Sequence, residues 1–222
     1  PFEAGSQTPI LQVFGEVQSQ RSLDIRSAVG GTVIELHPDF QNGGLVKEGD
    51  VLLRIDPSNA QTDLDLVEAD VADAQADLRE ATRALDLAKD EVAAAQEQAA
   101  LRLKALERQQ NLVARGVGTE ASVETAELAA SSSKQAILAR RQSFQSAEAR
   151  LDQAAARVMR VEISRAEAER NLRDTVLRAS FAGALANVTV LQGGTVANNE
   201  RIGQLVDPLA LEVALRVSTS QH

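Results

Sequence analysis

The stretch LVARGVGTEAS at residues 112–122 decides how this chain folds, because it contains the only two glycines between Ser58 and Ser180. Apart from these glycines, residues 58–175 contain neither glycine nor proline. Glycine and proline are the residues that most disfavour the interior of a helix, so their absence indicates a long helical region. The single interruption predicts one turn that joins two helices of similar length.

Apolar residues recur every seven positions on both sides of the turn, which is the pattern of a coiled coil. In the first arm the column consists of Leu64, Val71, Leu78, Leu85, Val92, Ala99, Leu106 and Val113. In the second arm it consists of Val123, Ala130, Ile137, Phe144, Leu151, Val158, Arg165 and Leu172. We call each column, together with the positions three residues after its members, a seam.

The two seams are mirror images about Gly118, since Val113 and Val123 lie five residues before and after it. Folding the chain at this glycine places the seams against each other, so the sequence predicts a long antiparallel helical hairpin. Polar residues interrupt the seams at Arg102, Gln109, Arg140 and Arg165. These interruptions indicate either local flexibility or contacts with neighbouring copies, and the sequence leaves both interpretations open.

The ends of the predicted helices carry capping signals. Gly116 suits the left-handed residue that follows a helix C-terminus. Thr119 is expected to cap the start of the second helix. At the base of the hairpin, Ser58 and Gln61 have the spacing of a capping box and follow directly after Pro57.

The charge distribution supports the antiparallel pairing. The base of the first arm is acidic and carries Asp63, Asp65, Glu68, Asp70, Asp73, Asp77 and Glu80. The base of the second arm is basic and carries Arg157, Arg160, Arg165, Arg170 and Arg173. These stretches face each other in the folded hairpin, and each sign is favourable at its own end of the helix dipole. We expect exposed ion pairs that each contribute about a few tenths of a kcal/mol.

The regions that flank the helices contain a repeated motif whose sequence pattern is typical of short strands joined by turns. Residues 30–57 and 182–208 share a Gly-x-hydrophobic opening, a central Gly-Gly-x-Val, and a closing hydrophobic residue followed by Asp-Pro. The Gly-Gly-x-Val elements occupy residues 43–46 and 193–196. Each half-motif is too small to bury a core of its own, so the two are expected to pack on each other.

The paired half-motifs resemble the two halves of a biotinyl/lipoyl domain. A lipoyl domain divided by a helical hairpin is similar to the HlyD-like periplasmic adaptors, or membrane fusion proteins, of Gram-negative tripartite efflux pumps, and most similar to the adaptors of RND pumps. At the hairpin tip that family carries an arginine, a leucine four residues later, and a serine or threonine seven residues beyond it. Arg108, Leu112 and Thr119 match this pattern, and Ala126 matches the following small position. Thr119 stands where serine is commoner.

The expected fold class is α+β, multi-domain and elongated. It consists of a split biotinyl/lipoyl-like β-sandwich interrupted by a long antiparallel α-helical coiled-coil hairpin, with partial β-barrel strands at both ends. The resemblance implies that the chain is a fragment of a longer protein. The expected domains are residues 1–21 for barrel strands, 22–57 for the first lipoyl half-motif, 58–175 for the hairpin with its tip at 114–119, 176–208 for the second half-motif, and 209–222 for the start of the barrel.

The resemblance implies a non-enzymatic adaptor in the periplasm, associated with the inner membrane. Its partners would be an inner-membrane RND-type transporter, a TolC-like outer-membrane channel, and further copies of itself in a ring. The hairpin tip would bind the channel through Arg108, Leu112, Thr119 and the nearby Val117. Membrane association would come only from a segment upstream of this chain or from the partners. The transported substrate and the ring size are not legible in the sequence.

Composition and single residues argue against other classes of protein. A net charge of −9 disfavours a nucleic-acid binder, and the absence of cysteine removes thiol chemistry. No apolar run is long enough to span a bilayer. His37 and His222 are the only histidines, too few for a metal cluster or a histidine-based triad. No cofactor is expected, because the hairpin replaces the turn on which a lipoyl or biotinyl carrier presents its lysine, and Lys47 has the sequence context of a surface turn.

Three alternatives stay open on the sequence. An adaptor of an ABC-type exporter has the same hairpin-and-lipoyl plan, and the identity of the pump would distinguish it. A biotin or lipoate carrier domain would contain a modified lysine that intact mass detects. A plain coiled-coil scaffold would leave flanks that form no compact domain once the hairpin is deleted.

Overall fold

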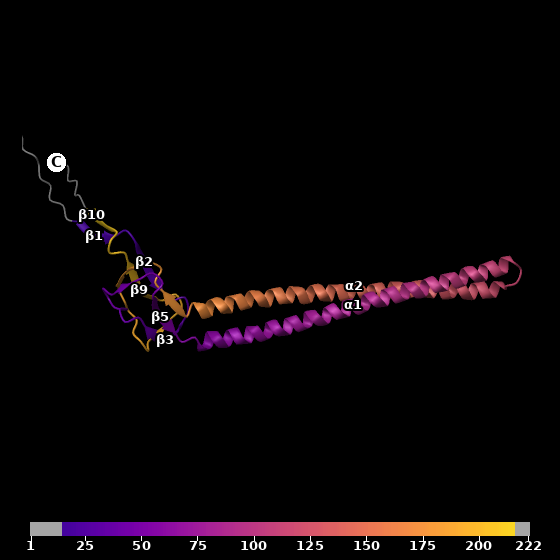
Figure 1. The fold of residues 1–222 in the computed structure, drawn as a ribbon, viewed down its shortest axis with the longest axis horizontal. Coiled ribbons are helices and arrows are strands. Elements are labelled where there is room, and N and C mark those ends of the chain that lie inside the picture. Colours follow the sequence, from indigo (N-terminus) through magenta and orange to yellow (C-terminus); the bar gives the residue numbers. More distant parts are fainter. Residues whose placement is uncertain (1–14, 216–222) are drawn as a thin grey trace, which may run out of the picture. The chain divides into compact units, whose positions relative to one another are not determined.

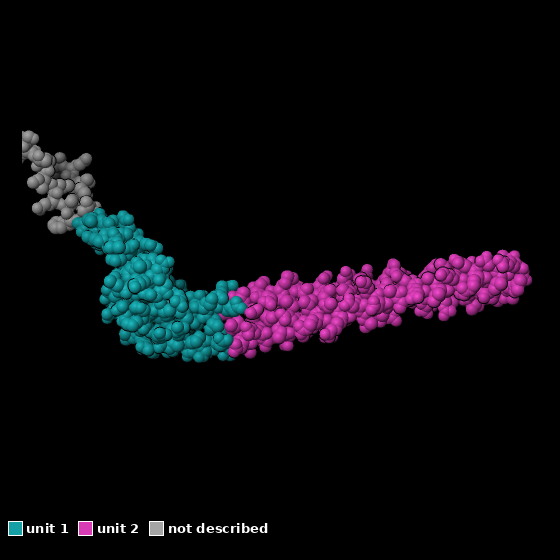
Figure 2. All heavy atoms as spheres, in the orientation of Figure 1, with its two compact units in different colours: residues 1–62, 169–222 teal, residues 63–168 magenta. Residues whose placement is uncertain are grey.

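The computed structural model describes residues 15–215, which divide into two compact units. One unit consists of the middle of the helical region, residues 63–168, and the other combines the segments before and after it (Figure 2). The outer parts of the expected barrel segments, residues 1–14 and 216–222, lie outside the described residues, and so does His222.

The helical region forms two long helices joined by one short turn. Helix α1 spans Ser58–Ala114 and helix α2 spans Glu120–Arg173 (Figure 1). Every residue of the two seams is buried or half-buried except Arg102, Arg140 and Gly116, and Gly116 already belongs to the turn. The predicted hairpin is therefore confirmed. The most buried seam residues are mainly alanines, whose small side chains let two helices approach closely: Ala74, Ala88, Ala130, Ala147 and Ala168, with Leu64 and Val71.

Ion pairs connect the two helices across the hairpin. Their nitrogen–oxygen distances are 4.0 Å for Arg165 and Glu68, 2.5 Å for Arg157 and Asp77, and 3.1 Å for Arg140 and Glu91. The first two pairs confirm that the acidic base of α1 faces the basic base of α2. The third gives the exposed seam residue Arg140 a partner on the opposite helix. Because these side chains are about half exposed, the pairs favour the register of the hairpin more than they stabilise it.

The start of α1 uses a capping group that the sequence analysis did not name. The carboxylate of Asp56 accepts a hydrogen bond from the amide of Ser58 at 3.0 Å and another from the hydroxyl of Ser58. The amide of Gln61 donates to the carbonyl of Pro57 at 2.8 Å. Asp56 thus provides an acceptor at the helix start, where the sequence had pointed to Ser58 and Gln61. Both hydrogen bonds from Ser58 lower the pKa of the Asp56 carboxyl, with the hydroxyl contributing most.

The flanking segments form two four-stranded antiparallel sheets, and each half-motif contributes two strands to each sheet. The first sheet has the order β2 (Ser22–Arg26), β9 (Arg201–Val206), β7 (Gly183–Ala186), β4 (Leu45–Val46). The second has the order β6 (Val176–Arg178), β5 (Val51–Ile55), β3 (Gly31–Leu36), β8 (Thr195–Val196). The expected association of the half-motifs is confirmed, and it takes the form of strand exchange, so neither half has a sheet of its own.

The two half-motifs make equivalent hydrogen bonds to each other. The amide of Gly43 donates to the carbonyl of Leu185 at 2.7 Å, and the amide of Gly193 donates to the carbonyl of Val33 at 2.8 Å. These glycines have φ values of 85° and 81°, a conformation that side chains rarely adopt. The repeated Gly-Gly-x-Val element therefore provides the turn that leads each half into the other half's sheet.

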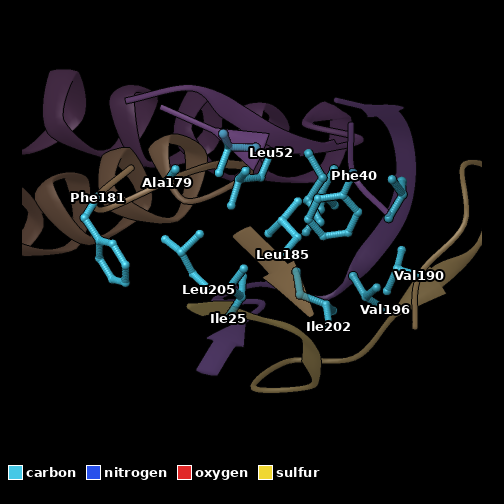
Figure 3. Close-up of a cluster of buried hydrophobic side chains, with 14 residues drawn as sticks. Ile25, Phe40, Leu52, Ala179, Phe181, Leu185, Val190, Val196, Ile202 and Leu205 are labelled. Carbon is cyan, nitrogen blue, oxygen red and sulfur yellow. The ribbon is translucent and has the colours of Figure 1, made fainter. Parts of the chain in front are cut away.

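The core of this unit lies between the two sheets and draws on both half-motifs (Figure 3). Its most deeply buried large side chains are Leu52, Leu53, Ile55, Leu185, Ile202, Leu205, Val33 and Val196. A third, two-stranded sheet pairs β1 (Gly15–Ser19) with β10 (Leu211–Leu215) antiparallel. These strands occupy the described part of the segments expected to pass into a barrel.

We predict that the Asp56 carboxyl titrates below the usual range of aspartate. Its folded pKa is lowered, so the stability that it contributes is fully present above the unfolded pKa and is lost as pH falls through the folded pKa. Carboxyl resonances followed by NMR across an acid titration measure this pKa.

Asp56→Asn is the matched control, because the amide oxygen still accepts hydrogen bonds but carries no titrating charge. The variant should lose this part of the acid dependence of unfolding. A midpoint for Asp56 at or above the ordinary aspartate value would contradict the prediction.

Candidate partner-binding tip of the hairpin

The end of α1 closes with the hydrogen-bond pattern of a Schellman motif. The amide of Val117 donates to the carbonyl of Leu112 at 3.0 Å, and the amide of Gly116 donates to the carbonyl of Val113 at 2.9 Å. Gly116 has a φ of 77°, which confirms its predicted left-handed conformation. These bonds satisfy carbonyls that a helix end would otherwise leave unpaired, so the turn holds a defined backbone path.

Gly118 is required for a different reason. A Cβ atom at this position would lie 2.8 Å from Cγ2 of Val113 and 3.0 Å from its backbone nitrogen. The backbone at Gly118 therefore packs against the last turn of α1 at a distance that no side chain permits. Gly116 and Gly118 thus serve one turn, the first through its conformation and the second through close approach.

Thr119 caps the start of α2. Its hydroxyl oxygen accepts a hydrogen bond from the amide of Ser122 at 3.3 Å, as predicted for an N-cap residue. The hydroxyl of Ser122 donates back to the carbonyl of Thr119 at 2.6 Å. Glu120 follows in the first turn, where a negative charge is favourable to the helix dipole. Both ends of the turn are consequently fixed by local hydrogen bonds.

The four residues that the sequence nominates for binding all lie at the surface of the tip. Leu112 is 40% exposed and Val117 is 78% exposed, and the side chains of Arg108 and Thr119 are exposed too. Arg108 and Leu112 are four residues apart on α1, so they share one face of the helix. Within residues 15–215, no ion pair involves Arg108.

The chemistry available at the tip is that of binding. It consists of a guanidinium, two apolar side chains held at the surface, and a hydroxyl that already serves the helix cap. In the part of the chain that the structure describes, no cluster of histidine, aspartate or glutamate has the arrangement of a metal site. None of the helices described there is both long and apolar enough to cross a membrane.

Several exposed leucines lie on the helices at positions that the seven-residue pattern does not single out. Leu101 is 61% exposed on α1 and Leu128 is 67% exposed on α2. Both lie outside the seams, and a search for seven-residue columns assigns only the buried face. A leucine at a helix position outside the seams would have been the sequence signal for an exposed apolar side chain.

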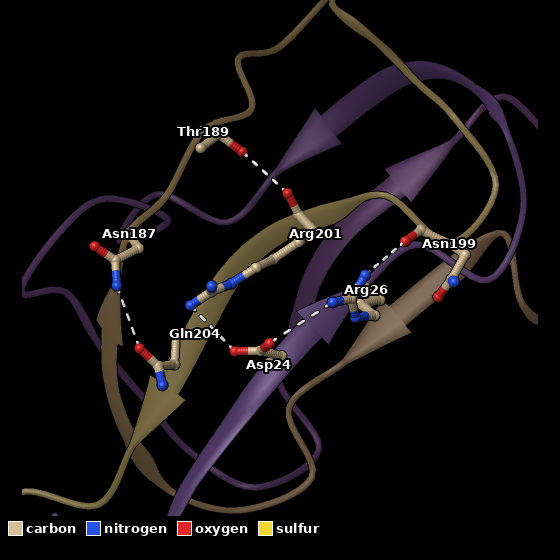
Figure 4. A network of polar contacts seen from close by, with 7 residues as sticks. All are labelled: Asp24, Arg26, Asn187, Thr189, Asn199, Arg201 and Gln204. Atoms are coloured by element: carbon tan, nitrogen blue, oxygen red, sulfur yellow. Dashed lines mark hydrogen bonds and ion pairs between the residues drawn. The ribbon is translucent and has the colours of Figure 1, made fainter.

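The polar network in Figure 4 is structural. On the first sheet, Asp24 bridges Arg26 at 3.8 Å and Arg201 at 3.1 Å. Arg26 also donates to the carbonyl of Asn199 at 3.0 Å, and Asn199 has a left-handed φ of 62°. The network therefore holds a strained turn in place.

The two residues considered for other chemistry also lie in turns. The ring Nδ1 of His37 accepts a hydrogen bond from the amide of Asp39 at 3.2 Å. Lys47 is exposed, and its amide donates to the carboxylate of Asp50 at 2.8 Å. These contacts shape local turns of the first half-motif.

Residues 21–207 match the family model described as the RND MFP, barrel-sandwich hybrid domain, where MFP stands for membrane fusion protein. The multidrug resistance protein MdtA of Klebsiella pneumoniae subsp. pneumoniae is 36% identical over 126 residues, which are 53% of this chain and 28% of MdtA. MdtA of Escherichia coli strain K12 matches with the same identity and coverage. The chain thus spans about a quarter of the length of these relatives.

The crystal structure of MacA from Actinobacillus actinomycetemcomitans is similar in fold. It aligns with a TM-score of 0.60 at 23% sequence identity, covering 90% of this chain and 53% of MacA. This likeness supports the architecture of a helical hairpin between strands of a barrel-sandwich hybrid.

We predict that Thr119→Val destabilises the hairpin by about 1 kcal/mol, because the amide of Ser122 loses its side-chain acceptor. Urea unfolding followed by far-ultraviolet circular dichroism measures the change.

Thr119→Ser keeps the acceptor and should stay within about 0.5 kcal/mol of the parent. If the serine and valine variants lost equal stability, the cap would not be the contribution of this residue.

Proposed function

The chain belongs to the family of RND membrane fusion proteins, and on this premise we propose that it is part of a non-enzymatic periplasmic adaptor of a tripartite efflux pump. The observation that carries the proposal is the family match over residues 21–207, which includes both half-motifs and the hairpin between them. The adaptor would connect an inner-membrane transporter with a TolC-like outer-membrane channel. Several copies would assemble around the path of the substrate, which passes without chemical change.

An RND-type transporter is the partner that we infer at the inner membrane. The description of the matching family model names RND, and the relatives from Klebsiella and Escherichia are named multidrug resistance proteins. Co-purification of the protein with transporters of each class tests this point. Recovery of an ABC-type exporter in place of an RND transporter would favour the alternative adaptor.

The domain organisation follows the same proposal. Residues 22–57 and 176–208 would form one lipoyl-like domain, and residues 58–175 would form the hairpin inserted into it. The strand pairing between the two half-motifs supports this division. Residues 1–21 and 209–222 would belong to the adjoining barrel, and the antiparallel pair of β1 and β10 is in keeping with that role.

The tip of the hairpin is the surface that we propose for the outer-membrane channel. Arg108 would donate hydrogen bonds to acceptors on the channel, while Leu112 and Val117 would bury apolar surface. Thr119 would contribute chiefly by holding the start of α2, since its hydroxyl is already hydrogen-bonded. A rigid turn favours such binding because little conformational freedom is lost when the partner docks.

We predict that Arg108→Asp abolishes efflux that depends on the channel, with helicity and thermal unfolding unchanged. The exposed side chain has no ion-pair partner within residues 15–215, so its replacement removes no internal contact of that kind. Binding to the channel should weaken by at least about 2 kcal/mol, the loss typical of a hot-spot residue. Growth of cells in the presence of a pump substrate reports efflux, and circular dichroism reports the fold.

Arg83→Asp is the matched control, because it makes the same charge reversal at an exposed position of α1 far from the turn. Leu112→Ser tests the apolar contribution in the same assay. Full efflux with Arg108→Asp, or equal loss with Arg83→Asp, would show that the tip does not dock as proposed.

A further inference from the structure

The two helices carry opposite charge in the last turns before the tip. Residues 102–115, which are the last turns of α1 and the residue that follows it, contain four cations and one carboxylate, and residues 120–133 of α2 contain three carboxylates and no cation. The cations are Arg102, Lys104, Arg108 and Arg115, and the carboxylates of α2 are Glu120, Glu124 and Glu127. In the described structure, the ion pairs between helices all lie nearer the base, so none joins these two sets.

Two of these cations, Arg108 and Arg115, belong to an exposed ridge that also contains Leu101 and Leu112. Leu101 and Arg108 are seven residues apart on α1, Leu112 lies four residues after Arg108, and Arg115 follows directly after the end of the helix. The amide of Arg115 donates to the carbonyls of Asn111 and Leu112, each at 3.2 Å, so the backbone stays close to helical geometry and all four residues share one side. Both leucines are exposed, at 61% and 40%. The ridge therefore combines two apolar side chains, Leu101 and Leu112, with two positive charges seven residues apart, at Arg108 and Arg115.

The acidic residues of α2 border a groove on the other side of the hairpin. Glu120, Glu124 and Glu127 line a groove of about 440 Å³ together with Val113, Val123, Ala114 and Gln110. Gln110 follows Arg108 by two residues, which is more than half a turn around α1, so the groove and the ridge lie on opposite sides. A separate groove beside Ala105 and Thr125, on the same side as the ridge, is lined by Arg102 and contains no carboxylate.

The spacing of the ridge matches the spacing of the groove. Arg108 and Arg115 lie ten and three residues before Gly118, while Glu127 and Glu120 lie nine and two residues after it. Each pair is separated by about 10.5 Å along its helix at 1.5 Å per residue. Two hairpins placed side by side with their tips level would therefore bring both arginines of one copy opposite both glutamates of the next.

We propose that the acidic groove of one hairpin receives the ridge of α1 from a second copy of this chain, in parallel register. The two arginine–glutamate contacts would fix the axial position of one hairpin against the next. The contact joins two different surfaces, so it repeats from copy to copy and can close a ring. The inference deepens the proposed assembly of several copies and rests on that function.

The electrostatic part of this contact acts on register more than on affinity. Exposed ion pairs contribute about 0.2–1 kcal/mol each, so two of them do not hold hairpins together by themselves. A shift of one copy along the other would separate both ion pairs at once. The two pairs together therefore select one axial register between neighbouring hairpins. Contacts in other parts of the protein would contribute most of the free energy that holds the copies together.

Cysteine cross-linking tests the proposal directly, because residues 1–222 contain no cysteine that would compete, and any cysteine elsewhere in the full-length protein is replaced by serine. Two differently tagged populations of the full-length protein, one Arg115→Cys and the other Glu120→Cys, are mixed and oxidised. The expected result is a mixed dimer several-fold more abundant than with the control pair, Gln110→Cys and Glu120→Cys, which places both cysteines on the acidic side. Equal yields from the two pairs, or no mixed dimer from the first, would overturn the proposal.

Charge reversal gives a second readout that does not use the docking residues of the tip. Arg115→Glu and Glu120→Arg should each lower the yield of cross-link between Leu101→Cys in one copy and Lys134→Cys in the next, and the double variant should restore it. These two positions lie seventeen residues before and sixteen residues after Gly118, so the proposed register places them at the same level. A double variant no better than either single one would exclude the matched register. If Arg108→Asp abolished efflux but no cross-link formed between the hairpins, the proposed adaptor function would be supported and the contact between copies would be excluded.

Discussion

The pairing of β5 with β6 is the constraint on which the rest of the structure depends. The amide of Ile55 donates to the carbonyl of Thr175 at 2.8 Å, although 119 residues lie between them in the chain. This contact brings together the point where the chain leaves the first half-motif and the point where it enters the second. The insertion between them must therefore begin and end at one place, and an antiparallel helical hairpin meets that requirement.

The same constraint explains why the half-motifs exchange strands. Each half supplies four short strands, and a core forms only where strands from both halves enclose it. The hydrogen bonds at Gly43 and Gly193 repeat the same exchange in both directions. A domain built in this way tolerates a long insertion between its halves, because its sheets close through contacts that do not involve the insertion.

The hairpin itself obeys a different limit. Two helices that pack through one narrow seam leave most of their surface in solvent, so apolar residues outside the seam stay exposed, as Leu101 and Leu128 do. The tip is held in one conformation by the Schellman motif, the close approach at Gly118 and the Thr119 cap. For an adaptor, this arrangement provides side chains of defined position at the tip and two sides that differ in charge near it.

Much of this architecture follows from the sequence alone. The seven-residue columns, the glycines of the turn, the Thr119 cap and the repeated Gly-Gly-x-Val element predicted the hairpin and the association of the half-motifs. These features depend on residues a few positions apart, where helix geometry and backbone conformation leave few choices. The four residues nominated at the tip were found at its surface, but their binding role is a proposal that also rests on family resemblance.

Tertiary structure decided the features that depend on pairing between distant segments. The order of strands in the two sheets, the partner of Arg140 on α1, and the acidic groove that Glu120, Glu124 and Glu127 border are not legible in local patterns. The sequence identified opposite charges on the two arms, but only the fold shows which of them meet within one hairpin and which face outward. The physical reason is that register between distant segments depends on the packing of the whole unit, whereas helices, caps and turns depend on neighbouring residues.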